Sequence, residues 1–280
     1  METHEGKINI TDDYMFGYVM RQPGICASMI ECLLPGIHVA DVHFKDTPDD
    51  TAPVQTQKTI QGAMGTHSVR LDVYLDDGHT VFNVEMQTGN KSNLPKRARF
   101  YGSRIDCDQL RISADYNELR PTYIIFICTY DPFDGGQYCY HFENCCKEEP
   151  GFHLGDESYK LFFNTKGTKG EISDELKKLL QYFNTPNSYS PEDGTELINK
   201  IDNFVNIANK DDDWRREYMT YAQAQLDARR EGQEEGAENN ARETAFRMNG
   251  FGLPLKLIAQ YLGVSEQKVT SWLNPVTVQA

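Results

Sequence analysis

The strongest pattern of hydrophobic and polar positions lies in residues 68–87, where two alternating stretches flank a short polar segment. Hydrophobic side chains occupy every second position from Val69 to Leu75 and again from Phe82 to Met86, and this period of two predicts β-strands. Between them, Asp77-Gly78 predicts a two-residue turn, because glycine accepts the positive φ that such turns require. The stretch is therefore a predicted β-hairpin.

A two-residue loop would fix the register of this hairpin, with Asp76 opposite His79. Asp72 is then diagonal to Glu85, roughly 7–8 Å away, and Gln87 lies on the same face. Two carboxylates at that spacing can hold one Mg²⁺, and a third polar group two residues on can orient a metal-bound water for attack on a phosphodiester. The same pattern also suits polar residues on the solvated outer face of a hairpin, so the spacing alone leaves both interpretations open.

The rest of the pattern predicts an α/β protein of the α+β type. Helical spacing predicts helices over residues 11–34, 92–111, 173–183 and 195–209. Alternating or continuous apolar runs predict, besides the hairpin, strands over residues 37–44, 122–129, 137–144 and 158–164. Residues 45–66 are polar and contain Pro and Gly, so we expect an irregular insertion or an extended edge structure there. The order helix, three strands, helix, strand gives an αβββαβ core.

The predicted helix over residues 92–111 carries the basic side chains nearest the hairpin. Arg97, Arg104 and Arg111 recur every seven residues and share one stripe of the helix, with Lys96 beside it. Residues 91–120 contain 7 basic and 4 acidic side chains, whereas the whole chain has a net charge of −14. The stripe is interpreted as a clamp for a phosphate backbone or as a solvated face. The overall acidity argues against broad electrostatic attraction to nucleic acid.

The C-terminal third predicts helices of two kinds. Residues 212–249 form a long polar stretch that favours a solvated helix, a bridge between two parts, or pairing with another chain as a homodimer. Residues 254–273 resemble a helix-turn-helix, in which Gly263 allows the turn and Ser265 caps the second helix. Its outward positions include one basic residue, Lys268, so DNA reading and a docking or dimer role both stay open.

Composition excludes several classes of protein. No apolar run of 18 residues is present, so no membrane span is expected, and the N-terminal segment METHEGKINI lacks the apolar region of a secretory signal. We therefore expect a cytoplasmic protein. The seven cysteines are odd in number and include no C-x-x-C, which argues against a disulfide framework or a structural zinc site. In the helical segment over residues 11–34, which Pro23-Gly24 is expected to divide into two helices, Asp13 or Glu31 is either a further acid for the hairpin site or a capping or surface residue.

Several motifs point to one family. They are Asp72, Asn83-Val84-Glu85-Met86-Gln87, Lys96-Arg97-Ala98-Arg99-Phe100-Tyr101, Tyr130-Asp131-Pro132-Phe133 and Leu161-Phe162-Phe163-Asn164-Thr165-Lys166-Gly167. With them the chain resembles, over about residues 10–273, the recombination-promoting nuclease and transposase family of the PD-(D/E)XK nuclease superfamily. Two positions depart from the superfamily. Leu71 stands where a Pro precedes the first acid, and Gln87 stands where most members have a Lys.

The resemblance implies a restriction-endonuclease-like core with a mixed central sheet over residues 1–186. A helical extension over 187–249 and a helix-turn-helix-like module over 250–280 would follow. It implies a DNA endonuclease dependent on Mg²⁺ or Mn²⁺, a hydrolase of phosphodiester bonds associated with DNA recombination or transposase-like activity. The metal would bind Asp72 and Glu85, and Gln87 would position the attacking water. The residues that would hold DNA phosphate are Lys96, Arg97, Arg104 and Arg111.

Two alternatives stay open beside this enzyme. Gln87 can orient a water but carries no positive charge, which favours a catalytically degenerate nuclease fold that binds DNA or a protein. A third interpretation is a structural scaffold that acts through the long helix over residues 212–249.

Overall fold

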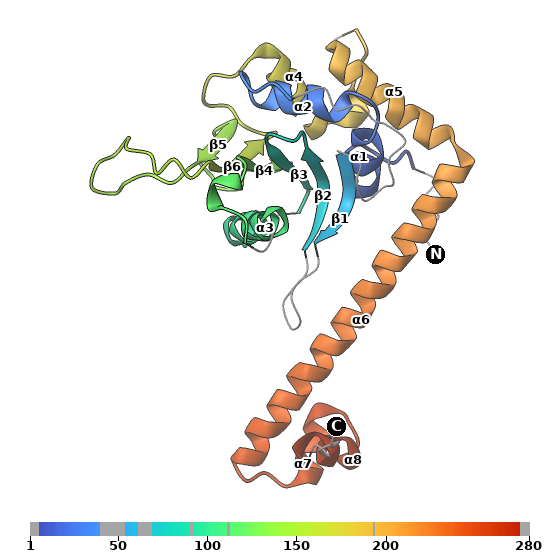
Figure 1. Cartoon of the computed structure of the whole chain (residues 1–280). Coiled ribbons are helices and arrows are strands. Elements are labelled where there is room, and N and C mark those ends of the chain that lie inside the picture. The colour runs from blue at the N-terminus through green and yellow to red at the C-terminus, as the bar shows by residue number, and fades with distance from the viewer. Residues whose placement is uncertain are drawn as a thin grey trace. The chain divides into compact units, whose positions relative to one another are not determined.

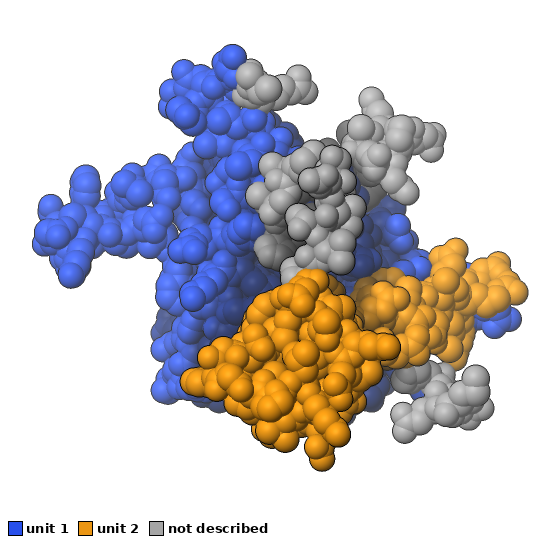
Figure 2. Space-filling model, turned by 90° about the horizontal axis from the view of Figure 1, so that it is seen from below, with its two compact units in different colours: residues 1–212 blue, residues 213–280 orange. Residues whose placement is uncertain are grey.

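The structure is a computed structural model that describes residues 6–39, 54–60, 69–89, 92–110, 113–192 and 194–274. The chain divides into two compact units, Met1–Asp212 and Asp213–Ala280, which are coloured separately in Figure 2. The division expected from the sequence, at residues 186 and 249, remains a prediction. Among the described residues, no helix combines the length and the apolar character needed to cross a membrane.

The first unit is built on a six-stranded sheet in the order β1-β2-β3-β4-β6-β5. Its strands are β1 (Val54–Ile60), β2 (Val69–Asp76), β3 (Val81–Gln87), β4 (Thr122–Cys128), β5 (Cys139–Phe142) and β6 (Ser158–Asn164). β3, β4 and β6 run parallel, whereas β1, β2 and β5 are antiparallel to their neighbours. The mixed sheet confirms the predicted fold class.

Helices cover both faces of this sheet (Figure 1). α3 (Leu94–Gln109) lies on one face, and the opposite face is covered by α1 (Asp13–Met20), α2 (Ile25–Leu33), α4 (Asp174–Asn184) and α5 (Glu196–Lys210). The sequence of β4 suits a strand covered by helices on both faces, because its apolar side chains are buried on each side of the sheet. Ile124 and Phe126 pack with Ala98 and Ile105 of α3, while Ile125 lies fully buried on the other face. The element order of α1, β1–β3, α3 and β4 confirms the predicted αβββαβ core.

The predicted register of the hairpin was wrong by two residues. Asp76 pairs with Val81 rather than with His79, and the loop is four residues long. The side chain of Asp77 accepts hydrogen bonds from the backbone N–H groups of His79 (2.9 Å) and Thr80 (2.7 Å). These bonds stabilise the wider turn in place of the two-residue one. Because the shift is an even number, every side chain keeps its predicted face of the sheet.

The first strand also differs from the prediction. Residues 37–39 of the predicted strand 37–44 are not in a strand, and residues 40–44 lie outside the described part. The strand that joins the hairpin is β1, within the stretch expected to be an irregular insertion or an extended edge structure. Val54 and Ile60 anchor its two ends in the core, while Lys58 is one of the polar residues between them. Such a composition suits the edge of a sheet.

The second unit contains most of the long helix α6 (Asp212–Gly250) and two short helices, α7 (Leu255–Leu262) and α8 (Glu266–Leu273). Gly263 ends α7 in the left-handed conformation with φ of 67°, and the hydroxyl of Ser265 accepts from Lys268 N at 3.2 Å. α7 and α8 share a small core with the last turns of α6: Ala245, Ile258, Ala259, Val269 and Trp272. The helix pair predicted over residues 254–273 is thus present.

Candidate active site

Asp72 and Glu85 lie side by side on neighbouring strands, on the face of the sheet that α3 covers. The pairing of β2 with β3 extends as far as Val73 and Val84. At the next residues, Asp72 and Glu85, side-chain carboxylates accept the hydrogen bonds that connect the two strands. The backbone N–H of Asp72 donates to Glu85 Oε1 at 3.2 Å, and the N–H of Met86 donates to Asp72 Oδ2 at 3.3 Å. Each acid is therefore held by the backbone of the opposite strand.

Glu85 and its polar neighbours on β3 are withdrawn from water, and Asp72 is half-buried. Asn83, Glu85 and Gln87 are exposed by only 0%, 2% and 6%, which rules out the alternative of a solvated outer face. Burial raises the pKa of the Glu85 carboxyl, and the negative charge of Asp72 raises it further. Burial likewise raises the pKa of Asp72, and the second contribution comes from the Asp13 carboxylate at the start of α1. The site therefore favours either a bound proton or a bound cation.

Gln87 is fixed at both ends of its amide. Its Oε1 accepts a 2.7 Å hydrogen bond from Arg97 Nη1, and its Nε2 donates to the carbonyl of Gly89 at 2.9 Å. The amide carbonyl therefore points at the guanidinium of α3. This places the Glu85 carboxylate, the Gln87 amide and a positive charge next to one another.

Arg97 connects the site to α3. Its Nη2 lies 3.5 Å from Glu85 Oε2 and donates to the Tyr101 hydroxyl at 3.0 Å. The guanidinium carbon lies 5.3 Å from the ring centre of Tyr101 and 5.5 Å from that of Phe126, which is cation–π distance. Packing and four polar or aromatic partners hold this side chain in the site.

Two of the other predicted phosphate-binding residues, Lys96 and Arg104, are described by the structure. Lys96 is exposed, next to Arg97 in the first turns of α3. Arg104 is half-buried two helical turns further along, about 10 Å from Arg97 along the helix axis. Arg111 lies outside the described residues. Among the described residues of the predicted stripe, Arg97 is the one with a contact to Glu85, and the phosphate-binding role of all four residues stays a prediction.

Three further residues belong to the site although the sequence gave them no firm role. Asn83 Nδ2 donates to Glu85 Oε1 at 3.1 Å, and Tyr101 holds Arg97 from one helical turn away. Both could have been found from spacing, since Asn83 shares the strand face of Glu85 and Tyr101 lies four residues after Arg97. Asp13 acts on Asp72 by its charge, whereas Glu31 accepts a bond from the backbone of Val39.

The donor chemistry of the site fits a hard divalent cation. Mg²⁺ and Mn²⁺ prefer oxygen ligands and are commonly held by one or two carboxylates plus water. Asp72 and Glu85 supply such carboxylates, and their burial beside each other creates negative charge that a cation would neutralise. The residues present therefore suit a divalent ion such as Mg²⁺ or Mn²⁺.

A sequence profile of the PD-(D/E)XK nuclease family transposases matches residues 51–235, about two thirds of the chain. No curated protein and no solved structure matches the chain. The matched range contains the hairpin, α3 and the rest of the sheet, and so it includes Asp72, Glu85, Gln87 and Arg97. The family indicates a nuclease- or transposase-type function with DNA as the substrate. The chain belongs to the PD-(D/E)XK nuclease family of transposases.

Proposed function

We propose that this protein is a DNA endonuclease that depends on Mg²⁺ or Mn²⁺ and hydrolyses phosphodiester bonds in recombination or transposition. The observation that carries the proposal is the cross-strand arrangement of Asp72 and Glu85. Each carboxylate accepts a backbone N–H from the opposite strand, so the hairpin itself holds the acids together. Such preorganisation is what a metal-dependent hydrolase requires of its ligands.

Asp72 and Glu85 would hold the metal, and the ion would supply activation of a water and polarisation of the phosphate. Gln87 orients the attacking water through its amide, which has a second N–H and a second oxygen lone pair besides those bonded to Gly89 and Arg97. Arg97 supplies the positive charge that Gln87 lacks. Its guanidinium already contacts the Gln87 Oε1 and lies beside Glu85, and it suits the negative charge that develops on a phosphate during attack.

One observation favours a second function. Arg97 already partly compensates the charge of Glu85 from within the chain, so the fold does not require an ion to stay intact. A nuclease fold that has lost turnover and binds DNA or a protein through its C-terminal helices would keep the same contacts. Association into a homodimer through those helices likewise stays a prediction.

Cleavage of supercoiled plasmid by the full-length chain in Mg²⁺ or Mn²⁺ tests the proposal. Asp72→Asn and Glu85→Gln are expected to lower the rate by at least about 10³-fold, as expected when a metal ligand is lost. Glu175→Gln, an exposed acid at the start of α4, is the matched control and should cleave at the wild-type rate. Equal rates in all four proteins would exclude this site. Gel-shift binding that survives Asp72→Asn but disappears on truncation after Asn249 would support the binding module instead.

A further inference from the structure

Beyond the sheet, the chain between β5 and β6 forms a projecting arm, residues 143–157, seen as the yellow-green loop in Figure 1. The arm is paired like a β-ribbon. Cys145 and His153 form a bridge, and Cys146 N donates to the carbonyl of Phe152 at 2.8 Å. Every residue of the arm is exposed except the half-buried Cys146. The arm therefore has paired strands but no hydrophobic core, and such a ribbon is marginally stable by itself.

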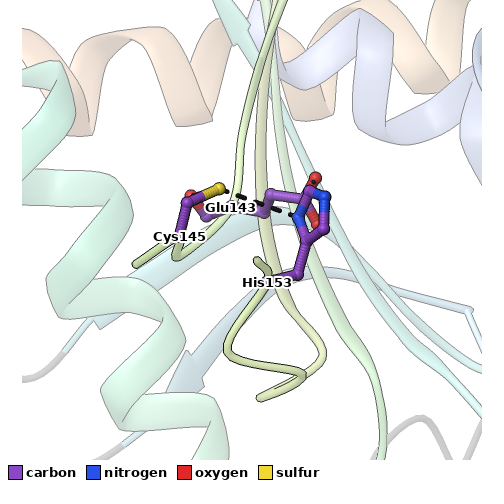
Figure 3. Close-up of side chains that lie close together, drawn as sticks. All are labelled: Glu143, Cys145 and His153. Carbon is purple, nitrogen blue, oxygen red and sulfur yellow. Dashed lines mark hydrogen bonds and ion pairs between the residues drawn. The ribbon is translucent and has the colours of Figure 1, made fainter. Parts of the chain in front are cut away.

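Glu143, Cys145 and His153 come together on one side of this arm (Figure 3). Cys145 faces His153 across the ribbon, and Glu143 precedes Cys145 by two residues, so all three side chains share a face. The Cys145 Sγ lies 3.7 Å from His153 Nδ1, and Glu143 Oε1 lies 2.9 Å from the same nitrogen. Among the described residues, this is the one group of three potential metal-ligand side chains whose donor atoms all lie within 4.8 Å of one another.

These distances are close to those of a tetrahedral zinc site. With Zn–S of about 2.3 Å and Zn–N and Zn–O of about 2.0–2.1 Å, the sulfur and nitrogen ligands lie about 3.6 Å apart and the nitrogen and oxygen about 3.3 Å. The observed pairs differ from those values by only a few tenths of an ångström. A thiolate, an imidazole and a carboxylate together favour zinc over the hard cations that suit all-oxygen sites.

We propose that Glu143, Cys145 and His153 bind Zn²⁺, with a water in the fourth position, and that the ion fastens the two strands of the arm together. A small unit without a core is commonly stabilised by a metal. The sequence alone argued against zinc because no C-x-x-C is present. The ligands are instead supplied by Glu-x-Cys on one strand and by a histidine that the ribbon brings opposite. The proposal does not depend on the nuclease activity assigned to Asp72 and Glu85.

Cobalt is the probe that distinguishes this site from the carboxylate site, because only a thiolate gives a sulfur-to-cobalt charge-transfer band. Titration of the reduced, full-length chain with Co²⁺ is expected to produce that band at one equivalent, and Zn²⁺ should displace it. Cys145→Ser should abolish the band. His153→Ala and Glu143→Gln should weaken the affinity for Co²⁺ at least about tenfold, since loss of even an outer-shell partner commonly weakens binding about 10–100-fold.

Cys146→Ser is the matched control, because Cys146 follows Cys145 directly and its Sγ is directed to Glu148 Oε2 at 3.5 Å. This variant should keep the band. Zn²⁺ should also slow tryptic cleavage after Lys147 in the arm of the wild type but not of Cys145→Ser. Absence of the band in the wild type would overturn the proposal. A band that is lost in Cys146→Ser and retained in Cys145→Ser would overturn it as well.

Discussion

Replacing Glu85 by Gln should make the metal-free protein more stable and at the same time remove its response to Mg²⁺. Glu85 is 2% exposed, and burial together with the neighbouring Asp72 raises the pKa of its carboxyl. Gln keeps the shape and can still accept from Asp72 N and Asn83 Nδ2. It removes the buried negative charge but loses a long 3.5 Å ion pair with Arg97.

The sign of the effect follows from proton linkage. An acid whose pKa is raised in the folded state binds more protons there than in the unfolded chain, so the free energy of unfolding falls as the pH rises above about 4, the unfolded value. The fall continues up to the raised pKa of the folded state. Glu85→Gln removes this loss. The pKa of Glu85 is raised to about 8 and each pKa unit corresponds to about 1.4 kcal/mol, so the loss at pH 8 is roughly 3–5 kcal/mol. We expect Glu85→Gln to raise the free energy of unfolding at pH 8 by that amount, less the contribution of the lost ion pair with Arg97, and to have little effect near pH 4.

Urea unfolding at pH 4.5 and pH 8, with and without Mg²⁺, measures both the change in metal-free stability and the stabilisation by the ion. For a ligand present at ten times its Kd, the wild type should gain about 1.4 kcal/mol from the ion, and Glu85→Gln should gain none. Glu175→Gln on the surface of α4 should stay within about 0.5 kcal/mol of the wild type in every condition. The reasoning would be refuted if Glu85→Gln destabilised the metal-free protein at pH 8, or if its gain in stability over the wild type did not increase between pH 4.5 and pH 8.

Three further outcomes are expected. Arg97→Lys should lower kcat/KM for plasmid cleavage about 10–100-fold, because a lysine cannot contact Glu85, Gln87 and Tyr101 together; an unchanged rate would show that the guanidinium is not needed. The affinity for Mg²⁺, measured by calorimetry, should rise with pH through the neutral range, since the raised pKa values mean that the ion must displace a proton; a pH-independent affinity would contradict this. Trp272→Ala should destabilise the α7–α8 core by about 3–5 kcal/mol in a scanning calorimetry trace while the transition of the first unit is unchanged; a shift of both transitions would show that the units unfold together.

The sequence predicted the parts of the fold that depend on local pattern. The continuous apolar run of β4 and the Gly263–Ser265 turn between α7 and α8 appear where the pattern predicts them, because burial and capping act over a few residues. The hairpin register was wrong because Asp77 has a local hydrogen-bonding option that the residue types alone do not rank above a two-residue turn. For β1 the pattern left an irregular insertion and an extended edge structure open, and the structure shows an edge strand. The sequence VQTQKTI could not decide between them because it has two buried residues and most of its stabilisation comes from pairing with β2.

In the candidate active site, too, the sequence predicted what depends on local pattern and missed what depends on packing between elements. The common face of Asp72, Glu85 and Gln87 follows from strand alternation and survives the register error, since an even shift preserves the face. The burial of these polar residues does not follow from alternation, because it depends on how closely α3 packs on the sheet. The role of Arg97 likewise depends on tertiary packing, which the sequence pattern does not show. The seven-residue repeat predicted three arginines on one stripe of the helix expected over residues 92–111, whereas the fold directs Arg97 to the acids and leaves Lys96 in solvent.

The different positions of Arg97, at the acids, and Lys96, in solvent, affect how the protein would bind DNA. With Arg97 held by Glu85, Gln87 and Tyr101, the phosphate backbone has few exposed basic side chains to meet along α3, among them Lys96 and Arg99. The net charge of −14 opposes DNA binding by the chain as a whole. About three phosphate contacts would give a slope of only about −2.7 in the dependence of log affinity on log salt concentration. Weak and weakly salt-dependent binding is therefore expected of the nuclease unit alone. A metal bound by Asp72 and Glu85 would then supply a large share of the local positive charge, so DNA affinity and cleavage should respond to the metal together.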